Sequence, residues 1–148
     1  MSYRPRVYTA SKIPHYVLWR KLKEDEAWNF VDWTASWVDH PEIGKENDGE
    51  EITDRTFRLA WIANINDVRD SDFVLLYCGQ EGALKGALIE AGCAIGMNMP
   101  VIAVGLPAEH SWAFHPLVTR CASLKEARLH LFRFTVMIPK KRRAEHDE

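Results

Sequence analysis

One glutamate in an otherwise apolar, small-residue segment is the side chain of this sequence best suited to chemistry. Glu90 is the only charged residue from position 86 through position 108. If the segment is helical, the neighbours of Glu90 three and four positions away are Gly86, Ala87, Cys93 and Ala94. A solvated glutamate normally shares its helical face with other polar groups. Glu90 is therefore either a carboxylate placed for a function or a rim residue stabilised by the helix N-terminus.

The segment around Glu90 has the pattern of a strand, a glycine-containing loop, a helix and a second strand. Two continuous apolar runs predict strands that are buried on both faces. The expected strands are Phe73–Tyr77 and Val101–Val104, with a loop over Gly79–Gly86 and a helix over Ala87–Met97. In a right-handed βαβ unit the helix begins near the carboxyl end of the first strand, where open α/β sheets bind their ligands.

Three further strands and three further helices are expected around this unit. The strands are Arg6–Ser11, Trp28–Val38 and Leu117–Ala122, and the helices are His15–Lys23, Glu50–Arg69 and Leu124–Phe134. This alternation predicts an α/β fold, a flavodoxin-like three-layer sandwich with a five-stranded, mainly parallel sheet in the order 2-1-3-4-5. With 148 residues, we expect a single domain over residues 1–148 and a flexible tail over about residues 136–148.

The long helix carries an asparagine on an apolar stripe. Phe57, Trp61 and Val68 recur at helical spacing, and Asn64 lies among them. One interpretation is a core or capping amide whose hydrogen bonds are satisfied within the fold. The other is that Asn64 points into the same crevice as Glu90.

Composition and motifs exclude several classes of function. The net charge of −2 gives no global attraction to a nucleic-acid polymer. Three scattered cysteines argue against a disulfide framework, and the six histidines show no metal-ligand spacing with carboxylates. The sequence has no P-loop and no GxGxxG motif, and the absence of a GxSxG elbow argues against a serine hydrolase. We expect no metal and no cofactor. Without a signal peptide or a bilayer-length apolar run, we expect a cytoplasmic protein with no membrane contact.

Four segments of the chain resemble the nucleoside 2-deoxyribosyltransferase-like superfamily. They are VYTAS, SDFVLLY, GALIEAG and GMNMPVIAVG, and the resemblance runs from about Val7 to about Leu131. It implies cleavage or transfer at the N-glycosidic bond of a (deoxy)nucleoside or nucleotide. Glu90 would be the nucleophile that attacks the anomeric carbon, and Tyr8 would donate a hydrogen bond to it. The resemblance also implies a homodimer or higher homo-oligomer.

Two positions depart from the superfamily pattern. Asn64 stands where an aspartate is frequent, and Leu84 stands where the transferases carry a second acid. Asn64 is still expected to contact the ligand, but an amide is a poor general acid. The sequence thus leaves open a hydrolase, a transferase that activates its base differently, and a nucleotide-binding or sensing module without turnover. A purely structural or partner-binding domain is a third class of interpretation.

Further substrate contacts are expected from the strand ends and from the loop before Glu90. Ser11 follows the first strand, where phosphate-using members of the superfamily hold a 5′-phosphate. Trp37 and Asp39 follow the second strand, where an aromatic ring can stack on a base. The alternative interpretation of Trp37 and Asp39 is that they belong to a strand edge and a turn and contact no ligand. The loop contributes Gly82, Lys85 and Gly86, with Lys85 either pairing with a phosphate or facing water.

Overall fold

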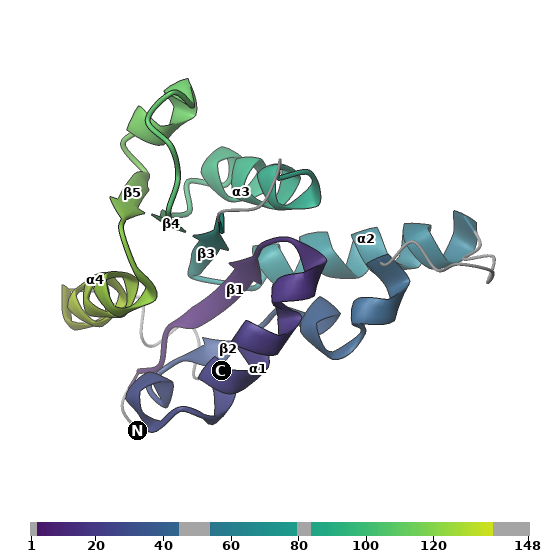
Figure 1. Cartoon of the computed structure of the whole chain (residues 1–148), viewed down its shortest axis with the longest axis horizontal. Coiled ribbons are helices and arrows are strands. Elements are labelled where there is room, and N and C mark those ends of the chain that lie inside the picture. The colour runs from purple at the N-terminus through teal and green to yellow at the C-terminus, as the bar shows by residue number, and fades with distance from the viewer. Residues whose placement is uncertain (1–2, 45–53, 80–83, 138–148) are drawn as a thin grey trace.

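Five parallel strands form one sheet in this computed structural model, which describes residues 3–44, 54–79 and 84–137. The order across the sheet is β2-β1-β3-β4-β5, as expected from the sequence (Figure 1). The strands are β1 (Arg6–Ala10), β2 (Asp32–Trp33), β3 (Phe73–Tyr77), β4 (Val101–Val104) and β5 (Val118–Cys121).

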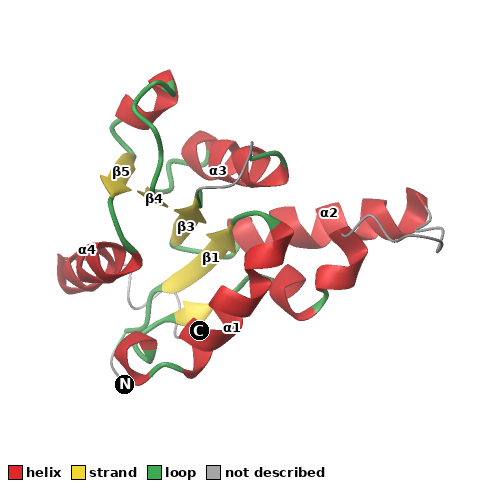
Figure 2. Ribbon diagram, viewed as in Figure 1, coloured by secondary structure: helices red, strands yellow, loops and turns green. Residues whose placement is uncertain are grey.

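Helices cover both faces of the sheet and complete a three-layer α/β fold of flavodoxin-like kind. α1 (Tyr16–Glu24) and α4 (Leu124–Met137) lie on one face, and α2 (Asp54–Arg69) and α3 (Gly86–Gly96) lie on the other (Figures 1 and 2). Short 3-10 turns lie between these elements: η1 (Ile13–His15), η2 (Glu26–Trp28), η3 (Ser36–Asp39), η4 (Pro41–Gly44) and η5 (Ser111–Phe114). Within the described ranges, no helix has the length and apolar character needed to cross a membrane.

The three central strands are apolar because both of their faces are covered. In β1, β3 and β4 nearly every residue is buried, including Val7, Leu75 and Ile102. Continuous apolar runs are typical of parallel strands that are covered by helices on both faces. The bounds of β3 and β4 are those that the sequence predicts.

The prediction of a strand over Trp28–Val38 is wrong for most of its length. Only Asp32 and Trp33 form a strand. Beyond them, Asp67 of α2 accepts hydrogen bonds from the backbone N–H and the hydroxyl of Ser36, at 2.9 and 2.6 Å, and the chain turns into η3. The aromatic and β-branched composition of this segment reflects burial of turn residues such as Trp28 and Val38.

The helix ends differ modestly from expectation. α3 begins at Gly86 and ends at Gly96, one residue earlier at each end than predicted. α4 continues three residues beyond the predicted Phe134. Residues 136 and 137 of the expected flexible tail are therefore helical, and residues 138–148 lie outside the described part of the chain. The first four residues of the expected long helix, 50–53, also lie outside it.

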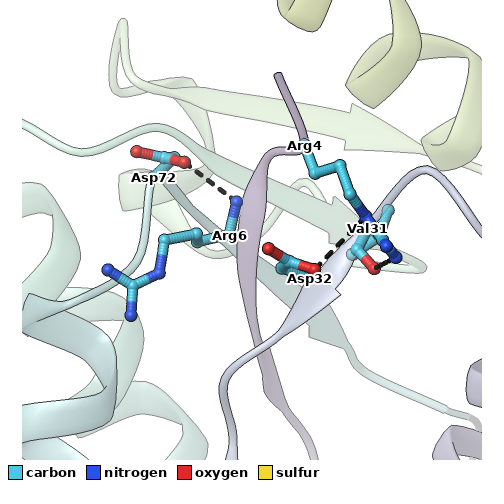
Figure 3. A network of polar contacts seen from close by, with 5 residues as sticks. All are labelled: Arg4, Arg6, Val31, Asp32 and Asp72. Carbon is cyan, nitrogen blue, oxygen red and sulfur yellow. Dashed lines mark hydrogen bonds and ion pairs between the residues drawn. The ribbon is translucent and has the colours of Figure 1, made fainter. Parts of the chain in front are cut away.

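Carboxylates join the amino-terminal ends of three neighbouring strands. The Asp72 carboxylate, just before β3, accepts the backbone N–H of Arg6 at 2.8 Å and the Tyr3 hydroxyl at 2.5 Å. Asp32 of β2 pairs with Arg4 at 3.2 Å (Figure 3). The Arg4 guanidinium also donates a 3.0 Å hydrogen bond to a backbone carbonyl beside β2. These contacts fix β1 between β2 and β3.

Candidate active site

Strand β1 and helix α3 bring Tyr8 and Glu90 together. Successive side chains of a strand point to opposite faces, and Tyr8 points to the face that α3 covers. Buried alanines at Ala87, Ala91 and Ala94 let α3 pack close to the sheet. The Tyr8 hydroxyl donates a 2.6 Å hydrogen bond to Glu90 Oε1, as the family resemblance implies. Tyr8 is fully buried, and Glu90 is only 5% exposed.

Burial makes the charged form of Glu90 costly. It raises the pKa of Glu90 from its ordinary value of 4.5 to about 7, while the hydrogen bond from Tyr8 acts in the lowering direction. Burial and then the neighbouring Glu90 charge raise the pKa of the Tyr8 hydroxyl, which therefore stays a hydrogen-bond donor. Near neutral pH the Glu90 carboxyl is divided between its two protonation states. Such a group can serve as a nucleophile or in proton transfer.

Glu90 lines a cavity of about 590 Å³ at the carboxyl ends of β1 and β3. The walls come from the chain just after β1, from the turns η3 and η4, from α2 and from the start of α3. This volume is within the range of small-molecule sites, and the location is the one expected for a ligand in an open α/β sheet. The aromatic residues that line the cavity are Trp37, His40, Phe57 and Trp61.

Several residues predicted from the sequence do line this cavity. Asn64 from α2 and Trp37 from η3 contribute to its wall, and Lys85 and Gly86 lie at the start of α3. The indole N–H of Trp37 donates a 2.8 Å hydrogen bond to the Thr9 carbonyl, which fixes the ring at the cavity wall. The structure thus gathers residues from three separate segments around one carboxylate.

Ser11 also lines the cavity, but its hydroxyl is already engaged. It accepts a 2.8 Å hydrogen bond from the Trp19 indole and donates a 2.9 Å bond to the Lys12 carbonyl. These contacts hold the chain where it leaves β1 and begins η1. Ser11 therefore shapes the cavity rim.

One further predicted contact, Asp39, is not found at the cavity. Asp39 is missing from the lining, and its carboxylate lies 3.8 Å from the Lys23 ammonium on the α1 side. The Asp39 side chain faces away from the cavity because the turn η3 replaces the predicted strand and changes which side chains point towards the cavity. Gly82 lies outside the described residues.

Phe57 and Trp61 lie on the apolar stripe that the sequence predicts, but that pattern alone does not connect the stripe to a ligand. In the structure both rings line the cavity and are partly exposed, at 43% and 36%. Their spacing with Asn64 was the available signal, because positions 57, 61 and 64 share one helical face. A Cβ added to Gly86 would lie 3.0 Å from the Trp61 ring, so glycine is the residue that permits this close contact.

The charges at the cavity are unequal. Among its described lining residues, Glu90 is the one carboxylic acid, while Lys12 and Lys85 are the ammonium groups. Flat aromatic walls suit a planar heterocycle, and the lysines and the Asn64 amide suit hydroxyl or phosphate oxygens. The arrangement offers one carboxylate to the reactive part of a ligand and polar and aromatic contacts to the rest.

Comparisons with known proteins support the fold but do not indicate an activity. The chain matches no family model and no curated protein. It is similar to a solved structure described as a conserved protein from Enterococcus faecalis V583, with a TM-score of 0.54 and 11% sequence identity. The similarity covers 88% of this chain and 99% of that chain. At this identity the likeness concerns the fold alone.

Proposed function

We propose that this protein cleaves or transfers at the N-glycosidic bond of a (deoxy)nucleoside or nucleotide, with Glu90 as the nucleophile. The observation that carries the proposal is the buried Glu90 carboxyl, held by Tyr8 at the wall of an aromatic-lined cavity. Without a function to retain it, an acid in this position would only cost stability. The sequence resemblance to nucleoside 2-deoxyribosyltransferases supplies the substrate class.

In the proposed reaction, ionised Glu90 attacks the anomeric carbon of the sugar. The bond from this carbon to the base breaks, and its electron pair leaves with the base. A glycosyl ester on Glu90 results, which water or a second base then resolves by attack at the same carbon. The Tyr8 hydrogen bond orients the carboxylate and favours its charged form.

The departing base needs a proton, and a general acid usually contributes about 10²–10⁴-fold to such a step. Since the described cavity lining has no second carboxylic acid, we assign this proton to solvent. The rate is then expected to fall steeply as the base becomes a poorer leaving group. This expectation distinguishes the proposal from a mechanism with a dedicated acid.

A panel of deoxynucleosides, nucleosides and their 5′-monophosphates tests the proposal, with free base measured by chromatography. We expect release from at least one substrate and a loss of at least about 10³-fold in Glu90→Gln. Glutamine keeps the size of the side chain and an acceptor for Tyr8, so a folded, inactive variant is informative. Equal release by Glu90→Gln would refute the nucleophile assignment.

The second candidate is a nucleotide-binding or sensing module without turnover. Asn64 and the missing second acid in the described lining favour it. It predicts saturable binding of a nucleotide by calorimetry with no product after prolonged incubation. The two candidates differ in a single measurement, the appearance of free base.

We further propose that the protein is a homodimer or higher homo-oligomer in the cytoplasm. The exposed side chains that support self-association are Leu59 and Ile62 on α2 and Ile89 on α3, each more than half exposed at 55%, 54% and 58%. The two helices pack against each other, and each of them exposes large apolar side chains. Light scattering should show that Ile62→Asp dissociates the oligomer. Leu129→Asp on α4, on the opposite face of the sheet, serves as the matched control and should leave the mass unchanged.

A further inference from the structure

Three potential metal ligands meet at the carboxyl end of β5, away from the cavity. Cys121 is the last residue of β5, and Glu126 and His130 lie one turn apart on α4. One ligand atom from each lies within 4.8 Å of the other two. Glu126 Oε1 and His130 Nε2 are 3.9 Å apart.

The first turn of α4 holds Glu126 in place. Its Oε2 accepts the backbone N–H of Ala122 at 2.8 Å, and its own N–H donates to the Ser123 hydroxyl at 3.2 Å. These are helix-capping contacts, and they leave Oε1 directed towards His130. Hydrogen bonds that fix a ligand's orientation in this way are typical of metal sites.

We propose that Cys121, Glu126 and His130 bind a zinc ion. A thiolate, an imidazole and a carboxylate form a donor set that suits the borderline softness of Zn²⁺. Tetrahedral zinc with bonds of roughly 2.0–2.3 Å requires these three atoms to move closer by about 1 Å. A fourth position remains for water or an exogenous ligand.

Charge and burial are consistent with a cation here. Cys121 is buried, whereas the Glu126 and His130 side chains are 46% and 28% exposed, so an ion can enter from solvent. A bound dication would displace the thiol proton of Cys121.

The site would act on the fold rather than on the proposed reaction. None of its three residues lines the cavity around Glu90. β5 is the edge strand of the sheet and pairs only with β4 among the described strands. A metal bridge from its last residue to α4 would fasten this edge, and we expect zinc to raise the melting temperature.

The experiment uses the full chain, kept reduced, with cobalt(II) as a spectroscopic probe and zinc as competitor. We expect one equivalent of cobalt, a thiolate-to-cobalt charge-transfer band and its loss on adding zinc. Cys121→Ser should abolish the band, and His130→Gln should weaken affinity by about tenfold or more. The matched controls are Cys78→Ser, another buried cysteine, and His115→Gln, and both should retain binding.

Two results would overturn the proposed zinc site. One is a wild-type protein that gives no thiolate band and no zinc-dependent rise in melting temperature. The other is metal binding that survives both Cys121→Ser and His130→Gln, which would place the metal elsewhere. His130 is partly exposed, so its variant remains informative if the buried Cys121 substitution prevents folding.

Discussion

Two tyrosines, one just before β1 and one within it, each donate a hydrogen bond to a carboxylate. Tyr3, ahead of β1, donates to Asp72, which also accepts the backbone N–H of Arg6. Tyr8, in the middle of β1, donates to Glu90. Asp72 is half-buried and Glu90 is buried. The same pair of chemical groups therefore lies in two different environments.

The two acids differ in whether the fold already uses their capacity to accept hydrogen bonds. Asp72 ties β1 to β3 through a backbone donor, so its acceptor capacity is used by the fold. Glu90 accepts its hydrogen bond from the Tyr8 side chain, so this bond does not join two strands. Glu90 also faces a cavity. Burial raises its pKa to about 7, so it stays poised between two protonation states.

The largest contrast is expected from removing each tyrosine hydroxyl. Tyr8→Phe should lower the rate of base release by about 10²-fold, the usual effect of losing one oriented donor. It should also move the alkaline rise of the pH–rate profile to higher pH, because the Tyr8 hydrogen bond lowers the Glu90 pKa. Tyr3→Phe should leave both unchanged. Equal effects of the two substitutions on rate would remove the distinction between the two tyrosine–carboxylate pairs.

A smaller contrast is expected in stability. Folding raises the Glu90 pKa from 4.5 to about 7, so the native state binds more protons than the unfolded state between these values. The contribution of Glu90 to stability is therefore full below about pH 4.5 and is lost as pH rises through 7. The glutamine of Glu90→Gln cannot ionise. The free energy of unfolding of this variant should therefore exceed that of the wild type at pH 8 by on the order of 2–3 kcal/mol.

Urea unfolding at several pH values measures this stability difference. At pH 4 the wild type and Glu90→Gln should coincide. Asp72→Asn should show no such gain at pH 8, because its carboxylate accepts bonds from Tyr3 and Arg6. A Glu90→Gln variant less stable than the wild type at pH 8 would mean that the carboxylate is stabilised where it lies.

The smallest effect is expected on ligand affinity. Asn64→Ala removes an amide from the cavity wall and should raise KM by about tenfold, the worth of one hydrogen bond. Asn66→Ala, on an exposed part of the same helix, is the matched control. If both variants bind substrate like the wild type, Asn64 belongs to the scaffold and does not contact the ligand.

The sequence predicts the sheet well where burial dictates composition. Phe73–Tyr77 and Val101–Val104 are strands with the expected bounds, since apolar runs of this length suit a sheet covered on both faces. The prediction of a strand over Trp28–Val38 is wrong because aromatic and β-branched residues also fill buried turns. Apolar composition indicates that a segment is buried, and burial alone does not distinguish a strand from a packed 3-10 turn.

The site was harder to predict for a related reason. The isolation of Glu90 was visible in the sequence, but its distance from Tyr8 depends on the packing of α3 against β1. Periodicity grouped Phe57, Trp61 and Asn64 on one face without showing that this face meets a cavity. The grouping of Cys121 with Glu126 and His130 depends on a chain reversal after β5, which residue spacing does not reveal.

The cavity's outer wall is built from the short turns η3 and η4, whereas Glu90 and Tyr8 belong to a helix and a central strand. Turns at the surface tolerate insertion and substitution far better than sheet residues do. Randomising His40 and Ile43 should therefore yield folded libraries whose members differ in the size of molecule they admit. New specificities would be reachable without redesigning the reactive carboxylate.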